Sequence, residues 1–247
     1  MDSGTLSLFI VAALLCEIIG TIGGFGSSVF FVPVARFFFP QTVVLGLTAI
    51  LHVFSNFSKL VLFWKSINWR IVTLFGISSV AMVILGAWLA TRISFRNFDL
   101  VMGCFLVLFS SLFLFFPQLR ISPTPLASVT SGTVAGFLAG IIGTGGAVRG
   151  LAMAAYNLDK NVFVASSAAV DMGVDTTRSV IYLDNGFIHT NHYYLVPILF
   201  VISLLGTWTG KLLLQRIRQE QFKKIVLGLI LSIGLLSLAK YFLGWKH

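Results

Sequence analysis

Long apolar segments fill most of this sequence and leave only short connections between them. Eight such segments can be marked, at residues 6–39, 43–64, 71–90, 100–116, 126–156, 162–183, 193–214 and 225–243. A helix needs about 20 apolar residues to cross the ~30 Å hydrocarbon core of a bilayer, and six of the segments suit one crossing. Only 10% of the 247 residues are charged, whereas soluble domains carry about 25%. The sequence therefore predicts an all-α polytopic membrane protein embedded in the lipid bilayer.

The first and fifth segments are too long for a single upright crossing. Each has more than 30 residues, which as a continuous helix would measure about 45–50 Å. Each also carries a glycine cluster near its middle, and a glycine costs about 1 kcal/mol relative to alanine inside a helix. A steeply tilted straight helix is one solution. The glycines favour the other, a broken helix or a re-entrant hairpin.

The two halves of the chain repeat each other at a constant offset of 120 residues. Three glycines of the first segment recur in the fifth, so that Gly20, Gly23 and Gly26 match Gly140, Gly143 and Gly146. The pattern Leu-Gly-x-Trp at 85–88 recurs at 205–208. Duplication around interrupted helices is typical of secondary transporters. We therefore predict two transmembrane repeats, residues 1–120 and 121–247, each with about four hydrophobic segments and opening with the glycine-broken or re-entrant one.

The distribution of charge bears on the orientation of these repeats. The net charge is +9, and most of the Lys and Arg residues fit the excess of cations in cytoplasmic loops, so no nucleic-acid partner is expected. Residues 211–224 hold five cations and 184–192 none, which places the former in the cytoplasm. Hairpin segments would give three crossings per half and inverted repeats; spanning segments would give four and parallel repeats. We favour inverted repeats, although cations at 65–70 and 92–96 are nearly balanced.

Polar side chains recur at the same helical spacing within the second and sixth segments. The two trios, each at i, i+4 and i+7, are His52, Asn56 and Lys59, and Asp171, Asp175 and Arg178. Ionisable groups inside a membrane cost at least ~2.5–3.5 kcal/mol each and usually pair with one another or line a cavity. In the functional interpretation the trios face each other. Asn56, Lys59 and Arg178 then bind an anion, while His52, Asp171 and Asp175 exchange a proton.

Two structural alternatives apply to these trios. A carboxylate of the sixth segment can simply neutralise Arg178 and fix helix packing. Lys59 and Arg178 can also extend toward a membrane interface, because each lies only a turn or two from the end of its segment.

The glycine clusters suit the same anion. A broken helix exposes backbone N–H groups at the start of its second half, and such an N-terminus binds anions. The candidate substrate ligands here are Gly23, Gly24, Gly26, Ser27 and Ser28 in the first half, and Gly143, Gly145, Gly146 and Arg149 in the second. Close helix packing is the plainer explanation of such glycines. Glu17 lies two turns before the first cluster and fits a proton path, a helix end or a packing hydrogen bond equally well.

The sequence carries no signature of catalysis. It contains no nucleophilic triad, phosphate-binding loop or zinc motif. Cys16 and Cys104 lie far apart in apolar segments, so we expect two buried thiols with neither a disulfide nor a metal site. The chain is predicted not to be an enzyme, to need no cofactor, and to depend on an ion gradient for any pumping.

At its glycine clusters the chain resembles the sulfite exporter TauE/SafE family of bacterial membrane permeases. The similar stretches are residues 20–26 with Pro33 seven positions on, residues 136–146, and the small-residue run 165–169. The chain departs from the family at Phe25, where consecutive glycines are usual, and has Met153 at the position equivalent to Pro33. The resemblance implies transport of a sulfur-containing or organic anion, such as sulfite or a sulfonate, across the cytoplasmic (inner) membrane, linked to protons.

These observations together predict a secondary transporter for a small anion. The alternatives are a non-transporting membrane scaffold or assembly protein, and an anion channel. A scaffold does not need paired charges inside the membrane, so the two trios favour transport. The sequence is also compatible with a homo-oligomer.

Overall fold

A computed structural model of the chain describes residues 3–90, 98–116, 118–119, 121–142, 146–188 and 190–243. Within these ranges all regular secondary structure is helical. The first half contains α1 (Ser3–Gly23), α2 (Ser28–Ala35), α3 (Gln41–Phe63), the 3-10 turn η1 (Trp64–Ser66), α4 (Trp69–Ala90) and α5 (Phe98–Phe115). The second half contains α6 (Pro125–Ile142), α7 (Gly146–Ala155), α8 (Lys160–Asp184), η2 (Thr190–His192), α9 (Leu195–Arg216) and α10 (Gln219–Phe242).

Five of the described helices are long and apolar enough to cross a bilayer. They lie at Ser3–Gly23, Thr42–Ser66, Trp69–Gly86, Leu195–Arg216 and Gln219–Ala239. Shorter apolar stretches occupy α5 and α6. Helix α8 has a suitable length of 25 residues, but it carries the charged trio of the second half. The protein is thus a multi-pass membrane protein, as predicted.

The first long segment is broken at its glycines, which confirms that part of the prediction. Helix α1 ends at Gly23, and α2 starts at Ser28. Gly24 and Gly26 adopt positive φ values of 74° and 96°, a backbone conformation that side chains other than glycine rarely take. A Cβ atom on Gly20 would lie 2.5 Å from the Cα of Ser27. The chain therefore turns back sharply, and only glycines allow α2 to start so close to α1.

The second long segment is interrupted at the matching place. Helix α6 ends at Ile142 and α7 begins at Gly146, while Gly143 and Gly145 lie outside the described residues. A Cβ atom on Gly146 would come within 2.4 Å of the Phe25 carbonyl oxygen. The glycine at the start of α7 thus lets the two interrupted regions touch at the centre of the molecule.

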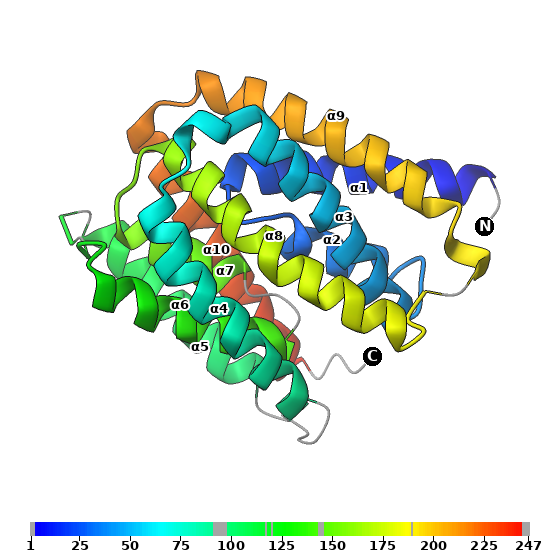
Figure 1. The fold of residues 1–247 in the computed structure, drawn as a ribbon, viewed down its shortest axis with the longest axis horizontal. Coiled ribbons are helices and arrows are strands. Elements are labelled where there is room, and N and C mark those ends of the chain that lie inside the picture. The colour runs from blue at the N-terminus through cyan, green and yellow to red at the C-terminus, as the bar shows by residue number, and fades with distance from the viewer. Residues whose placement is uncertain are drawn as a thin grey trace.

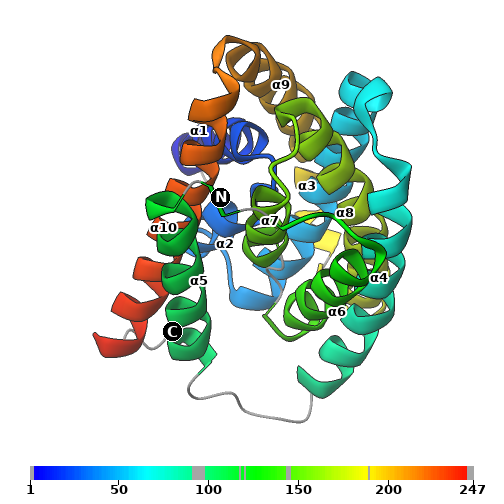
Figure 2. The same ribbon diagram turned by 90° about the vertical axis from the view of Figure 1, so that its left-hand side faces the viewer.

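The helices pack in pairs around this centre. Helix α3 lies against α8, α1 against α9, α4 against α6, and α5 against α10. In Figure 1, α3 and α8 cross the middle of the molecule in opposite directions. Helix α2 contacts both α1 and α3. Figure 2 shows α7 inside the bundle, with the α5–α10 pair on one side and α4 and α6 on the other. The interruptions are therefore enclosed by the long helices.

Glycines allow two of these pairs to approach closely. On α6, a Cβ atom at Gly136 would lie 2.2 Å from the Ser79 carbonyl oxygen of α4. On α9, a Cβ atom at Gly206 would lie 2.7 Å from Cγ of Glu17 on α1. Small residues at such contacts are typical of membrane helices, which gain little from burying apolar surface away from equally apolar lipid.

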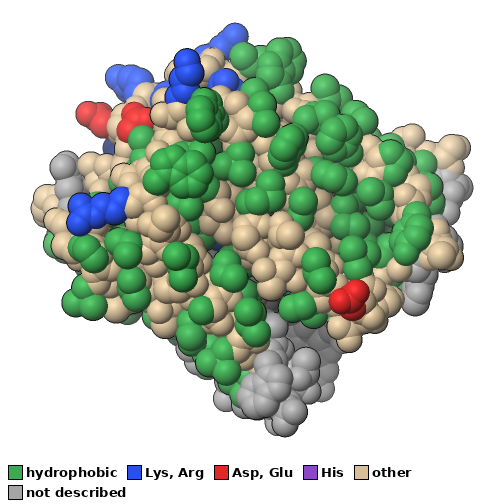
Figure 3. All heavy atoms as spheres, in the orientation of Figure 1, with side chains coloured by type: hydrophobic (Ala, Val, Ile, Leu, Met, Phe, Trp, Pro, Cys, Tyr) green, Lys and Arg blue, Asp and Glu red, His purple; other side chains and the backbone are tan. Residues whose placement is uncertain are grey.

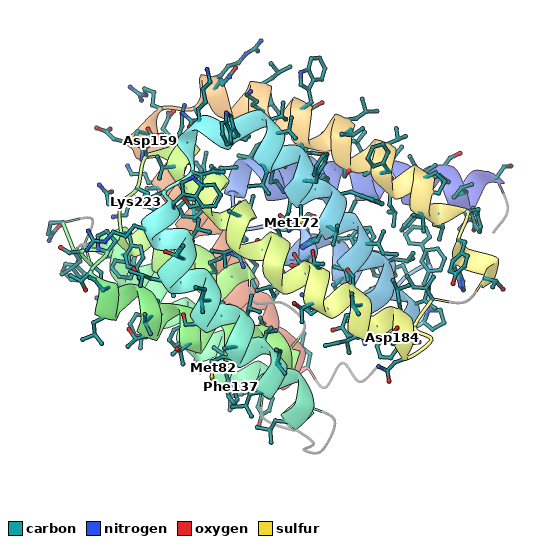
Figure 4. The ribbon with its side chains drawn as sticks, in the orientation of Figure 1. Met82, Phe137, Asp159, Met172, Asp184 and Lys223 are labelled. Carbon is teal, nitrogen blue, oxygen red and sulfur yellow. The ribbon has the colours of Figure 1, made fainter. Side chains whose placement is uncertain are left out.

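The surface has the character expected of a membrane protein. Hydrophobic side chains cover much of the face in Figure 3, and Lys and Arg gather at its upper left. Lys223 and Asp159 lie toward this end in Figure 4, whereas Asp184 lies at the opposite end. Exposed aromatic residues occur at helix ends, with Trp64 and Trp69 near one end and Tyr193 and Tyr194 near the other.

One expectation about the thiols is wrong. Cys16 is buried, but Cys104 is exposed on α5. A thiol behaves as a small apolar group, so lipid accommodates it as well as a protein core does. Apolar neighbours in the sequence therefore do not show whether a thiol lies in the protein core or on the exposed face of a helix.

Candidate functional site

Both polar trios lie inside the bundle. Lys59 is 2% exposed and Arg178 5%, so neither side chain extends to a membrane interface, and that alternative is wrong. Met172, labelled near the middle of α8 in Figure 4, follows Asp171 directly in the chain. The charged trio of α8 therefore begins midway between the two ends of the bundle.

Asp175 is where the trio of α3 meets the trio of α8. Its Oδ2 atom lies 3.2 Å from Nδ1 of His52 and accepts a hydrogen bond of 3.0 Å from the Asn56 amide. Its Oδ1 atom accepts a bond of 3.1 Å from Nη1 of Arg178. The shared helical spacing thus predicted correctly that these parts of the two helices face each other.

Arg149 fastens the second interruption to the first. Its guanidinium forms an ion pair with Asp171. Its Nε donates to the Ser167 hydroxyl at 2.9 Å, and its Nη2 donates to the Phe25 carbonyl at 3.0 Å. The side chain therefore joins α7, α8 and the α1–α2 connection while it remains buried.

Lys59 does not join the α8 trio, which corrects the simple picture of two facing trios. Its Nζ atom lies 3.1 Å from Oε1 of Glu17 on α1 and donates to the Ser55 hydroxyl at 2.5 Å. Asp171 is already paired with Arg149. Because a buried charge needs a partner in a medium of low dielectric constant, Lys59 is held by the carboxylate of another helix.

Glu17, whose role the sequence did not decide, is the centre of a polar cluster. Its side chain is fully buried. Its donors are Lys59 and four hydroxyls, those of Thr21, Ser27, Ser55 and Thr207. Two signals could have found it. Thr21 follows one turn later on the same face of α1, and Lys59 had no carboxylate of its own on α3.

A small cavity lies between the two interruptions. Its volume is about 10 Å³, which is room for about one water molecule. A sulfite or sulfonate ion is several times larger, so this conformation is closed around the site. The polar lining comes from Ser28, His52, Arg149, Asp171, Asp175 and Arg178, and the remainder from Phe25, Ala139, Gly146 and Val174.

The other predicted ligands lie at varied distances from this cavity. Ser27 contacts His52, with 3.2 Å between its Oγ and Nε2, and a Cβ atom on Gly26 would lie 3.3 Å from Cε1 of His52. Gly23 and Gly24 instead face the side chains of Phe25 and Phe163. Those two glycines thus allow the backbone to turn and the aromatic side chains to pack closely, and they do not line the cavity.

Arg178 is only partly hydrogen-bonded. Its Nη1 atom bonds Asp175, but its buried Nε and Nη2 atoms have no hydrogen-bond partner among the described residues. The guanidinium carbon lies 5.6 Å from the centre of the Tyr182 ring, a favourable cation–π distance. Buried polar groups are rarely left unpaired, so a role in ion pairing alone leaves half of this guanidinium unexplained.

Comparison with known protein families identifies the family of this chain. The family model described as sulfite exporter TauE/SafE matches residues 8–237. No curated protein and no solved structure is similar enough to the chain to count as a match.

Proposed function

Because the chain belongs to the sulfite exporter TauE/SafE family, we propose that it is a proton-linked secondary transporter for a small oxyanion of the sulfite or sulfonate class. It is not an enzyme in this proposal, and it works in the bacterial cytoplasmic membrane with its basic end inside. The observation that carries the proposal is the closed cavity between the two interruptions. A half-unpartnered guanidinium faces it there beside His52 and Arg149.

Arg178 supplies the main contact to the anion. A guanidinium offers two parallel N–H donors that match two oxygens of a sulfite or sulfonate group. Its Nε and Nη2 atoms are buried and available for such a contact. The hydroxyl of Ser28 and the backbone at the start of α2 add further donors, since a helix N-terminus favours anions. Gly26, Ser27, Asn56, Gly146 and Arg149 complete the surroundings, and Gly143 and Gly145 belong to the same proposed set.

Proton linkage follows from the charge of the central group. With His52 neutral, Asp175 and Arg178 balance each other. With His52 protonated, the three side chains carry one net positive charge, which a bound monoanion neutralises. In this proposal anion binding and protonation of His52 favour each other, and Asp171 and Asp175 are the carboxylates proposed to exchange that proton.

The proposal includes inverted repeats over residues 1–120 and 121–247. The packing supports this proposal. Helix α1 packs on α9, and their proposed equivalents in the other repeat, α6 and α4, also pack on each other. The two helices that would be equivalent, α3 and α8, run in opposite directions in Figure 1. Lys211 on α9 also donates to the Leu62 carbonyl near the end of α3 at 3.0 Å. The cations at 65–70 therefore lie near those at 211–224, as the inverted arrangement requires. Rocking of one repeat against the other would open the cavity alternately.

Counterflow in proteoliposomes tests this function. Purified protein is reconstituted in vesicles loaded with unlabelled sulfite, and entry of labelled sulfite is followed with and without a pH gradient. We expect saturable counterflow and gradient-driven accumulation. A channel would show flux without stimulation by internal sulfite. If neither sulfite nor a small sulfonate gives saturable flux, the transporter proposal fails.

A further inference from the structure

The hydroxyl of Ser27 connects the Glu17 cluster with the central site. Its Oγ atom donates to Oε2 of Glu17 at 2.6 Å and lies 3.2 Å from Nε2 of His52. The other ring nitrogen of His52 contacts Asp175 at 3.2 Å. All four side chains are buried. A continuous series of hydrogen-bonding groups thus runs from Asp175 to Glu17 with no gap that needs a water molecule.

We propose that Glu17 receives the coupling proton from His52 through the Ser27 hydroxyl. The inference rests on the proposed anion transport. In the step, the Nε2–H bond of protonated His52 breaks as a new O–H bond forms on Ser27. The former Ser27 proton forms an O–H bond on Oε2 of Glu17. His52 becomes neutral and Glu17 becomes a carboxylic acid. No other reactant is needed, and reversal of the same bonds returns the proton.

The surroundings of Glu17 fit a proton acceptor of this kind. The charged or titratable side chains near it, among the described residues, are Lys59 and His52 of α3 and the adjacent Cys16 of α1. Among the described side chains, the α1–α2 connection and α9 contribute only hydroxyls to it, from Ser27 and Thr207. The step therefore moves one positive charge from the anion site to the Glu17–Lys59 pair. This leaves the site neutral after the anion has left.

The series is also oriented along the membrane-crossing helices. Lys59 lies one turn before the end of α3, where the Leu62 carbonyl accepts a hydrogen bond from Lys211 of the basic end. Arg178 lies in the last third of α8, whose final residue, Asp184, is at the opposite end in Figure 4. The series from Arg178 through Asp175, His52 and Ser27 to Glu17 therefore leads from the central site toward the basic end.

The second half does not offer the same path. At the sequence offset of 120 residues, Phe137 corresponds to Glu17, and Ala147 corresponds to Ser27. Neither side chain can accept or pass on a proton. Phe137 lies toward the outer edge of α6 in Figure 4. The route from the central site to the basic end is thus expected to run through Ser27 and Glu17 of the first half.

The test compares two kinds of sulfite flux in each variant. Counterflow needs the anion site to open alternately but does not need net proton release, whereas accumulation driven by a pH gradient needs both. For Glu17→Gln we expect counterflow to persist and gradient-driven accumulation to be lost. For Ser27→Ala we expect the ratio of gradient-driven accumulation to counterflow to fall, whatever the counterflow itself does. Thr207→Val is the matched control, because it removes one hydroxyl from Glu17 without touching the Ser27 bridge. Its ratio should equal that of the wild type.

The outcomes separate this inference from the proposed function. Absence of counterflow in the wild type would overturn the transporter itself. Counterflow together with an unchanged ratio in Glu17→Gln would overturn the Glu17 path and leave the transporter intact. If Glu17→Gln does not fold because Lys59 is left without its carboxylate, the double variant Glu17→Gln/Lys59→Met removes both charges together. A wild-type ratio in that variant would equally contradict the proposal.

Discussion

The charged side chains beside the two helix interruptions are opposite in sign. Next to the α1–α2 break, the carboxylate of Glu17 gathers four hydroxyls and one ammonium group. Next to the α6–α7 interruption, the guanidinium of Arg149 gathers a carboxylate, a hydroxyl and a carbonyl. The first cluster reaches the cavity only through a hydroxyl, whereas Arg149 lines the cavity itself. The surroundings of the two interruptions therefore differ both in the charge they carry and in their access to the cavity.

The first prediction tests whether Arg149 is the structural clamp of this comparison. Arg149→Ala leaves the carboxylate of Asp171 buried without its partner and frees the Phe25 carbonyl. Breaking a buried ion pair from one side costs about 3–5 kcal/mol, so we expect a large loss of thermal stability in detergent and of monodisperse yield. Arg149→Met/Asp171→Asn should recover most of that loss.

Lys59→Met is the matched variant at the other interruption. It also deprives a buried carboxylate of its cation, but Glu17 keeps its four hydroxyl donors. We therefore expect a smaller loss of thermal stability than in Arg149→Ala. Equal losses would show that the two clusters do not differ in the way the hydrogen bonds indicate.

The second prediction concerns the glycine of the first break that adjoins the cavity. Gly26→Ala places a methyl group 3.3 Å from His52 at a backbone with φ of 96°. Such a conformation costs about 1–3 kcal/mol for a residue with a side chain, and His52 must also shift. We expect moderate destabilisation together with a clear loss of sulfite counterflow.

Gly186→Ala separates backbone strain from the effect on the site. Gly186 has φ of 70°, and no atom of the described residues would lie within 4 Å of the added methyl group. It lies in the turn after α8, away from the cavity. This variant should lose stability but keep its counterflow per folded molecule. If the two variants lose counterflow equally, Gly26 has no special relation to the site.

Local sequence patterns predicted several of these features correctly. The glycine cluster predicted the break after Gly23, because only glycine adopts the positive φ values found at Gly24 and Gly26 without strain. The spacing of i, i+4 and i+7 predicted the common face that brings His52 and Asn56 to Asp175. Segment lengths predicted several of the helices that are long and apolar enough to cross a bilayer, although α5 and α8 are not among those helices, and the quoted motifs predicted the family.

Contacts between distant helices could not be predicted in the same way. Lys59 pairs with a carboxylate 42 positions earlier in the chain, and helical spacing carries no information on which neighbouring helix a face meets. The pair of Arg149 and Asp171 depends in addition on how α7 folds back inside the bundle. For the same reason the family resemblance gave a substrate class but not the partners of these side chains.

The third prediction compares the guanidinium groups of Arg178 and Arg149. Two nitrogen atoms of Arg178 have no hydrogen-bond partner among the described residues, whereas all three of Arg149 have a polar partner. Arg178→Lys keeps the charge but loses the planar pair of donors. If Arg178 binds the anion, the apparent affinity for sulfite should fall by roughly tenfold, the effect of one charged hydrogen bond worth about 1.5 kcal/mol. The concentration dependence of counterflow measures this effect.

A purely structural role for Arg178 predicts a different set of results. In that case Arg178→Lys should be nearly silent, and Arg178→Ala should be harmful because it leaves Asp175 without its cation. Adding Asp175→Asn would then restore transport. Recovery in Arg178→Ala/Asp175→Asn would remove Arg178 from the proposed anion ligands and leave Arg149 as the cation of the cavity to test.

The smallest effects should come from removing one hydroxyl at each interruption. Ser167→Ala leaves the Nε–H of Arg149 buried without an acceptor, which costs about 1–3 kcal/mol. Thr21→Val removes a donor at 3.3 Å from Glu17, a carboxylate that has four others. A remaining donor can compensate there, so we expect less than about 1 kcal/mol. Thermal unfolding of the two variants in the same detergent measures the difference. A larger loss in Thr21→Val would show that the hydroxyls around Glu17 act as one rigid network, and a proton could then reach Glu17 only if several of them turned together.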